Sequence, residues 1–187
     1  MRKLLTFSAF AAAFIAASLF LTSTVHAANC TWTGASPNNM GLGQANWSDA
    51  ANWSGCAGNA PTTGDDLFFP AGAIWTINND DLAYLEVSSI NFPDTQSYTL
   101  NGTGTLAISN GIYADNGWHY LNISNIQIAQ DNVAILTAAS ATIDFSNNLS
   151  LINHSVMLTT TAGGGSGVRF FGSITGSSGA VINKAGT

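Results

Sequence analysis

The chain has few charged side chains and very few basic ones. Asp, Glu, Lys and Arg make up 7% of the 187 residues, against roughly 25% in ordinary soluble domains. Only four residues are Lys or Arg, and two of these, Arg2 and Lys3, open the chain. The remainder sets Arg169 and Lys184 against ten acidic residues. Two cations do not neutralise a run of phosphates, so the composition excludes nucleic acid and electrostatic attraction to anionic lipid.

Low charge does not make this chain disordered. Disordered segments combine low hydrophobicity with high net charge, whereas 46% of these residues are hydrophobic. Solubility must therefore depend on uncharged Asn, Ser, Thr and Gly, a composition typical of extracellular β-rich repeat proteins.

The first 27 residues have the order of a secretory signal peptide. The basic pair is followed by an apolar run from Leu4 to Leu21, and Val25 and Ala27 place small residues at −3 and −1 of a cleavage site. The run exceeds the roughly 7–15 residues usual for such a segment, so an uncleaved membrane anchor is the alternative. No later stretch approaches the ~18 apolar residues of a membrane span. We expect a secreted or cell-surface protein with no transmembrane segment after cleavage.

Cysteine is scarce, with two residues in the mature chain, Cys30 and Cys56. In an oxidising compartment an even pair predicts a disulfide. Two free thiols or half of a metal site are the alternatives, and no further Cys or His lies close by in the sequence.

Two zones follow the signal peptide. Residues 28–70 are rich in Gly, Asn, Ser, Pro and Trp and show no sustained periodicity. Residues 71–187 are a succession of short apolar or alternating runs typical of β-strands. The runs are 74–77, 85–87, 97–100, 105–108, 120–123, 126–128, 133–136, 141–145, 149–152, 156–158, 168–171 and 181–182. No part of the mature chain has a helical period, so the sequence predicts an all-β protein.

Turn-forming residues separate the runs, and they leave two architectures open. They include Asn78 to Asp81, Asn101-Gly102, Asn110-Gly111, Asn116-Gly117 and Asn147-Asn148. Asn-Gly between alternating apolar runs ordinarily indicates a hairpin, which favours a β-sandwich. Short runs at nearly even intervals favour a right-handed parallel β-helix, in which uncharged polar residues form ladders between turns. We favour the solenoid and keep the sandwich as the alternative.

A solenoid exposes apolar side chains and unpaired backbone groups at its ends. Trp32, Trp47 and Trp53 lie in the loop-like zone, between the two cysteines or next to them. We expect these indoles, linked by the Cys30–Cys56 disulfide, to cover the first turn as an N-terminal cap.

The same residues carry a family resemblance. Thr31 to Ala35 (TWTGA), the Asn-Trp pairs at 46–47 and 52–53, and Pro61 to Phe69 (PTTGDDLFF) resemble the start of bacterial autotransporter-type surface proteins. Gly172 to Thr187 resembles the first half of an autotransporter-associated β-strand repeat. The resemblance implies a β-helical passenger. Because the chain stops in the middle of the repeat pattern, it also implies a fragment truncated at the C-terminus, with residues 71–187 as the solenoid.

Catalytic arrangements are weak in this sequence. Lyase chemistry needs a base and commonly calcium, but neither Arg169 nor Lys184 has acidic neighbours in the sequence. The adjacent pairs Asp65-Asp66 and Asp80-Asp81 point to opposite faces if they lie on strands, and cap backbone N–H groups if they lie in turns. Calcium at Asp65 and Asp66, completed by Asp49, is a lesser alternative to a turn. We expect no catalytic residues, no metal and no cofactor.

One aromatic segment stands out from the remaining runs. His119 and His154 lack a Cys partner and make a poor zinc site. Trp118 and Tyr120 fall on one face of a strand by alternation, where they pack as core, stack along one turn of the coil, or form a platform for a sugar. The first hypothesis is therefore a structural or adhesive surface passenger. A carbohydrate-binding module contacting surface glycans or other extracellular polymers is the second, and a polysaccharide-degrading β-helix enzyme the third.

Overall fold

A computed structural model describes residues 27–39, 44–56, 59–161 and 166–185. The predicted signal peptide lies outside the described residues except for its last residue. Two short 3-10 helices span Pro37–Asn39 and Ala50–Asn52. The strands are β1 Asn29–Trp32, β2 Ala45–Asn46, β3 Trp53–Ser54, β4 Asp66–Phe68, β5 Ile77–Asp80, β6 Tyr84–Phe92, β7 Thr99–Ile128, β8 Val133–Phe145, β9 Asn148–Ser150, β10 Ser155–Thr160, β11 Gly167–Phe170, β12 Ile174–Thr175 and β13 Val181–Ala185.

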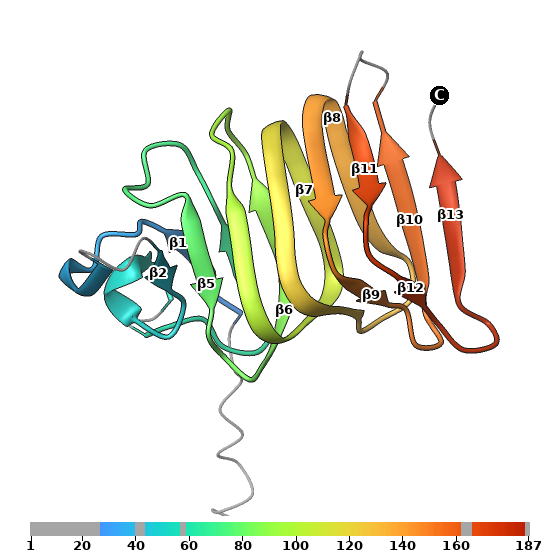
Figure 1. The fold of residues 1–187 in the computed structure, drawn as a ribbon, viewed down its shortest axis with the longest axis horizontal. Coiled ribbons are helices and arrows are strands. Elements are labelled where there is room, and N and C mark those ends of the chain that lie inside the picture. The colour runs from blue at the N-terminus through green and yellow to red at the C-terminus, as the bar shows by residue number, and fades with distance from the viewer. Residues whose placement is uncertain (1–26, 40–43, 57–58, 162–165, 186–187) are drawn as a thin grey trace, which may run out of the picture.

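The strands form a parallel β-helix of about five turns, as the sequence predicts (Figure 1). Each strand lies beside the strand one turn later and runs in the same direction. Leu67 pairs with Ile90, Ile112 with Ile135, and Leu149 with Ile174. From β5 onward the paired residues are 21 to 26 positions apart. One turn of the coil therefore takes about that many residues.

The alternative β-sandwich is wrong. Among the strand pairs of the described residues, only β1 with β3 is antiparallel. The Asn-Gly pairs at 101–102, 110–111 and 116–117 do not reverse the chain, because all three lie inside β7. That strand bends around the coil for 30 residues, which is more than one full turn. Bending within a strand replaces the predicted hairpins.

A close approach between turns explains one glycine of β7. A Cβ atom built at Gly104 would lie 2.1 Å from the carbonyl oxygen of Leu82 in the preceding turn. Real Cβ atoms do not approach an oxygen so closely, so only glycine lets the two backbones pass here.

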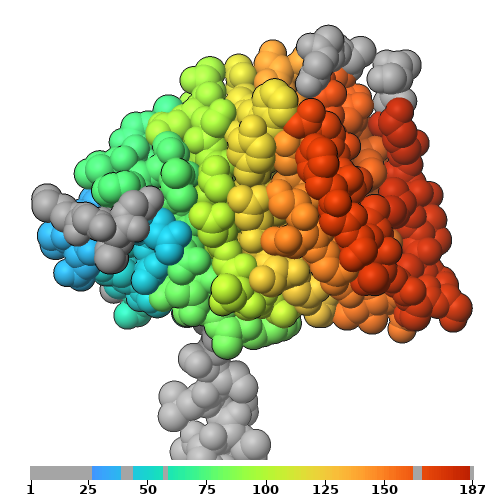
Figure 2. Space-filling view, in the orientation of Figure 1, coloured from blue at the N-terminus to red at the C-terminus, as the bar shows by residue number. Residues whose placement is uncertain are grey.

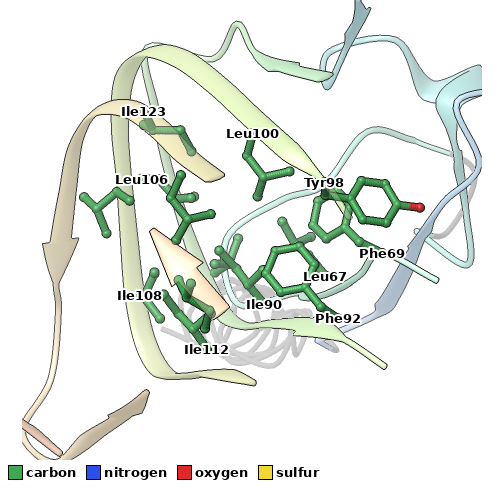
Figure 3. Close-up of a cluster of buried hydrophobic side chains, with 14 of the residues drawn as sticks. Leu67, Phe69, Ile90, Phe92, Tyr98, Leu100, Leu106, Ile108, Ile112 and Ile123 are labelled. Carbon is green, nitrogen blue, oxygen red and sulfur yellow. The ribbon is translucent and has the colours of Figure 1, made fainter. Parts of the chain in front are cut away.

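The core is a column of apolar side chains from successive turns. Many strands alternate between the interior and the surface; β6, for example, buries Leu85, Val87, Ile90 and Phe92. Figure 3 shows side chains of this column converging inside the coil. Burial on this scale is the main stabilising contribution, at roughly 25 cal/mol per Å² of apolar surface.

Asparagines form a ladder along the coil. Asn46, Asn79 and Asn101 are register partners in three successive turns. The side-chain amide of Asn79 donates to Asn46 Oδ1, and that of Asn122 donates to Asn101 Oδ1, each at 3.2 Å. Neutral amides in register can hydrogen-bond to one another, whereas like charges at the same positions would repel. The ladder is therefore built from uncharged residues.

The predicted bounds of one strand are wrong. The run 74–77 is predicted as strand and the stretch 78–81 as turn, but β5 begins at Ile77 and extends to Asp80. Ile74 is exposed, whereas Asn78 is fully buried. Hydrogen bonds to polar partners stabilise this strand in place of apolar contacts, which hydrophobic periodicity does not detect.

Candidate functional site

The three tryptophans of residues 28–70 lie together at the N-terminal end of the core. Trp32, Trp47 and Trp53 are almost fully buried. The rings of Trp32 and Trp47 lie 4.9 and 5.8 Å from that of Trp53, both edge to face. All three rings lie about 6 Å from Phe69, which stacks in turn on Phe92. The indoles therefore continue the aromatic column of the core, and each indole N–H has an acceptor.

The predicted Cys30–Cys56 disulfide is formed. It lies beside the tryptophan cluster, and both sulfurs belong to the buried core. Residues 28–70 also pair with the later turns, because β1 lies parallel to β4 and β4 parallel to β6. The predicted division at residue 70 thus falls within one continuous sheet.

The acidic residues singled out in the sequence accept hydrogen bonds that hold loops and turns. Asp65 is buried and accepts from the backbone N–H groups of Ala28 and Thr62, both at 2.8 Å. Asp49 accepts from Ser36 and Asn38 side chains, and these bonds lower the pKa of Asp49. Further acceptor roles are those of Asp66 toward Ser89, Asp80 toward Leu82 and Asp81 toward Ser48.

The described ranges contain no cluster of three or more His, Cys, Asp or Glu residues with metal-binding geometry. His119 is buried against Phe92 at 3.9 Å between ring centroids, and burial lowers its pKa to about 4. His154 lies 3.5 Å from Asp131 near the surface. The two histidines therefore occupy different environments, one in the core and one at an exposed carboxylate.

Trp118 and Tyr120 lie on the outer face of β7. They are 41% and 39% exposed, large fractions for side chains of this size. Their rings are nearly parallel, with centroids 6.1 Å apart and planes inclined by 12°. The pair therefore forms a stack on the surface rather than packing in the core.

A partly buried ion pair holds the Trp118 ring in position. The indole N–H donates to Asp144 Oδ2 at 2.7 Å from the next turn. Arg169, one turn further, donates from Nε and Nη2 to both carboxylate oxygens of Asp144 at 2.7 and 2.6 Å. The same guanidinium lies over the Trp118 ring, 4.4 Å from its centroid. A cation over an aromatic face is stabilising, and a bidentate Arg–carboxylate pair is geometrically rigid.

The ion pair leaves the platform without net charge. The Asp144 side chain is only 2% exposed, whereas that of Arg169 is 44% exposed. Burial disfavours the ionised carboxylate, but the hydrogen bonds from Arg169 and Trp118 outweigh it and lower the pKa of Asp144. The Asp144 carboxylate is therefore buried beneath the aromatic surface, where it binds Trp118 and Arg169 and does not reach a ligand.

A hollow of about 310 Å³ adjoins Trp118. Such a volume is at the lower end of the roughly 300–1,000 Å³ of small-molecule sites. Its walls are uncharged and combine one indole with several hydroxyl groups. They are formed by Ser97, Gly117, Trp118, Ala139, Ser140, Thr142 and Ser166.

Comparisons with protein-family models, with curated proteins and with solved structures found no match for this chain. The resemblance to autotransporter-type passengers therefore stays a prediction. In the part of the chain that the structure describes, no helix has the length and apolar character needed to cross a membrane.

Alternation in the sequence singles out Trp118 and Tyr120 but not the residues that hold them. Arg169 has no acidic neighbours in the sequence, yet in space it binds Asp144. The two are register partners in β11 and β8, 25 positions apart. Such register partners can be identified in the sequence only when the number of residues in one turn is known.

Proposed function

We propose that this protein is an extracytoplasmic β-helical module of the structural or adhesive kind, without catalytic activity. The observation that carries the proposal is a pair of aromatic rings held outward on β7 and contacted by side chains from two neighbouring strands. Trp118, Asp144 and Arg169 come from β7, β8 and β11, and their mutual contacts orient the surface. A preorganised patch on a rigid scaffold is suited to contact without chemistry.

Export is supported by the order of residues 1–27 in the sequence and by the disulfide. A disulfide persists in oxidising compartments and is rare in the reducing cytosol. The buried Cys30–Cys56 pair is compatible with such a compartment. The autotransporter-type resemblance of the sequence supports the proposal that the module belongs to a passenger exposed at the cell surface.

Carbohydrate binding is the second candidate, and the exposure of Trp118 and Tyr120 favours it. An exposed aromatic ring offers an apolar face that stacks on the C–H face of a sugar. The third candidate, a polysaccharide-degrading enzyme, has less support. Hydrolysis needs two carboxylates facing a bond across several ångströms of open space, while Asp65, Asp80 and Asp144 are all buried and bound within the protein.

The test is export and adhesion of the full chain in a bacterial host. Proteolysis of intact cells should remove the chain from the surface, or the mature chain should be recovered outside the cells. Beads coated with the recovered protein should be retained under flow on films of extracellular polysaccharide, with no release of reducing sugars. Retention in the cytoplasm, or steady release of soluble sugar, would contradict the proposal.

A further inference from the structure

We infer that the hollow beside Trp118 binds a neutral saccharide, with the free face of the indole as its stacking surface and Asp144 and Arg169 as positioning residues. The inference rests on the adhesive function proposed above and adds a ligand class and a site to it.

The two faces of the Trp118 ring have different neighbours. Tyr120 lies two positions after Trp118 on β7, and Arg169 lies in the register column of Tyr120. Both contact the indole from this side. Trp118, Thr142 and Gly167 are register partners in three successive turns. Besides Ser97 and Thr142, which lie beside Trp118 in the neighbouring turns, the walls of the hollow come from residues that precede this register column. The wall residues Gly117, Ser140 and Ser166 each precede one of these three residues along the chain. One indole face is thus occupied by protein, and the other borders the hollow.

The chemistry of the hollow matches an uncharged, hydroxyl-rich ring. Every described residue of its wall is uncharged, and Asp144 and Arg169, the ionised side chains that hold Trp118, pair with each other at 2.6 Å. Ser97, Ser140, Thr142 and Ser166 give the wall hydroxyl groups, of which Ser97 Oγ already accepts from the backbone N–H of Trp118 at 3.0 Å. Hydroxyl groups both donate and accept, as sugar hydroxyls do. An anionic sugar would find no cation here that is not already paired.

Two other hollows of similar size lack this combination. One, of about 330 Å³, contains the carboxylate of Asp115 and the aliphatic side chain of Leu136. The other, of about 280 Å³, borders the buried Trp32 and the exposed Ile74. Neither has an exposed aromatic ring held by an ion pair. The rigid indole distinguishes the Trp118 hollow, because a preorganised ring loses little entropy on binding.

The experiment is a titration of the isotope-labelled mature chain, followed by its amide and indole NMR signals. The probes are cellohexaose, mannohexaose and chitohexaose, with trigalacturonic acid as a charged probe. We expect at least one neutral probe to shift the Trp118 indole signal and the amides of Gly117, Ser140 and Thr142. Trp118→Ala should weaken that binding at least about tenfold, and Trp118→Phe should have an intermediate effect. Tyr84→Ala, at another exposed aromatic residue, should leave the affinity unchanged.

Positioning by the ion pair is tested with Arg169→Lys, which retains the positive charge but loses the planar fork. We expect the affinity to fall about threefold or more, with a broadened Trp118 indole signal and an unchanged midpoint of unfolding. A lower unfolding midpoint with unchanged affinity of the folded chain would give Arg169 a merely structural role and overturn its assignment.

Three results would overturn the saccharide site: no neutral probe binds, only the charged probe binds, or binding survives Trp118→Ala. Adhesion under flow that persists in Trp118→Ala would overturn this site while leaving the adhesive function intact. Failure of export or adhesion in the unmodified chain would instead contradict the proposed function.

Discussion

At the scale of single residues, Asp80 is a carboxyl group whose ionised form is strongly disfavoured by burial. It is fully buried on the inner face of β5, and its Oδ2 has no hydrogen-bond partner. Burial raises its pKa to about 7, against the weaker opposing effect of the Leu82 N–H. Between its ordinary value of 3.8 and this raised value, the folded chain binds more protons than the unfolded chain. Asp80 therefore lowers stability as pH rises through this window.

Asp80→Asn should stabilise the protein above pH 7 and have little effect near pH 4. The expected gain is up to roughly 4 kcal/mol, because each pKa unit corresponds to about 1.4 kcal/mol. Denaturant unfolding from pH 4 to pH 8 measures it, with the exposed Asp115→Asn as the matched control. A difference that does not change with pH would show that the Asp80 carboxyl is not perturbed by burial.

At the scale of elements, the N-terminal tryptophan cluster and the corners of the coil are the sensitive points. Trp53 contacts Trp32, Trp47 and Phe69 at once. Its loss opens a cavity where the first turn meets the end of the core.

Trp53→Ala should lower the free energy of unfolding by about 3–5 kcal/mol, the usual loss for a large buried aromatic side chain. Ile74→Ala, at a side chain 70% exposed, should change it by less than about 0.5 kcal/mol. Equilibrium unfolding in urea compares the two. Equal, small effects would mean that the indoles do not stabilise this end of the coil.

Gly104→Ala should destabilise the coil by about 1–3 kcal/mol, because the added methyl would overlap the Leu82 carbonyl of the preceding turn. Thr103→Ala, at the exposed neighbouring position, serves as the control. The midpoint of thermal unfolding measures both. Stabilisation by Gly104→Ala would contradict so close an approach of the two turns.

The sequence predicts the elements better where side chains alternate than where polar groups stabilise them. Strand length, even spacing and scarce charge together indicate the solenoid, and the cysteines indicate their own disulfide. Asn78 and Asn101 are misassigned to turns because their hydrogen bonds reach other turns of the coil. The ion pair between Asp144 and Arg169 cannot be predicted from local sequence for the same reason. It depends on the number of residues in one turn, which no local pattern gives.

At the scale of the whole molecule, the two described ends of the coil differ. The N-terminal end is filled with buried aromatic rings and closed by the disulfide. The last described turns, at the opposite end in Figure 2, carry apolar side chains that face solvent. These are Ile152, Met157, Phe171, Ile174, Val181 and Ile182.

Removal of the disulfide should destabilise the chain without changing its fold. Cys30 and Cys56 are 26 positions apart, and closing such a loop contributes up to about 3.5 kcal/mol by restricting the unfolded chain. A reducing agent should lower the unfolding midpoint of the unmodified protein to that of the Cys30→Ala/Cys56→Ala variant. The variant itself should be insensitive to reductant. An unmodified protein that is equally insensitive would rule out a stabilising bond.

The most direct test of the account is retention of protein-coated beads under flow on a neutral polysaccharide film, with unmodified protein, Trp118→Ala and Tyr84→Ala compared at equal coating density. We predict that beads carrying the unmodified protein or Tyr84→Ala are retained and that those carrying Trp118→Ala are washed away. Equal retention of all three would contradict a function centred on the Trp118 surface.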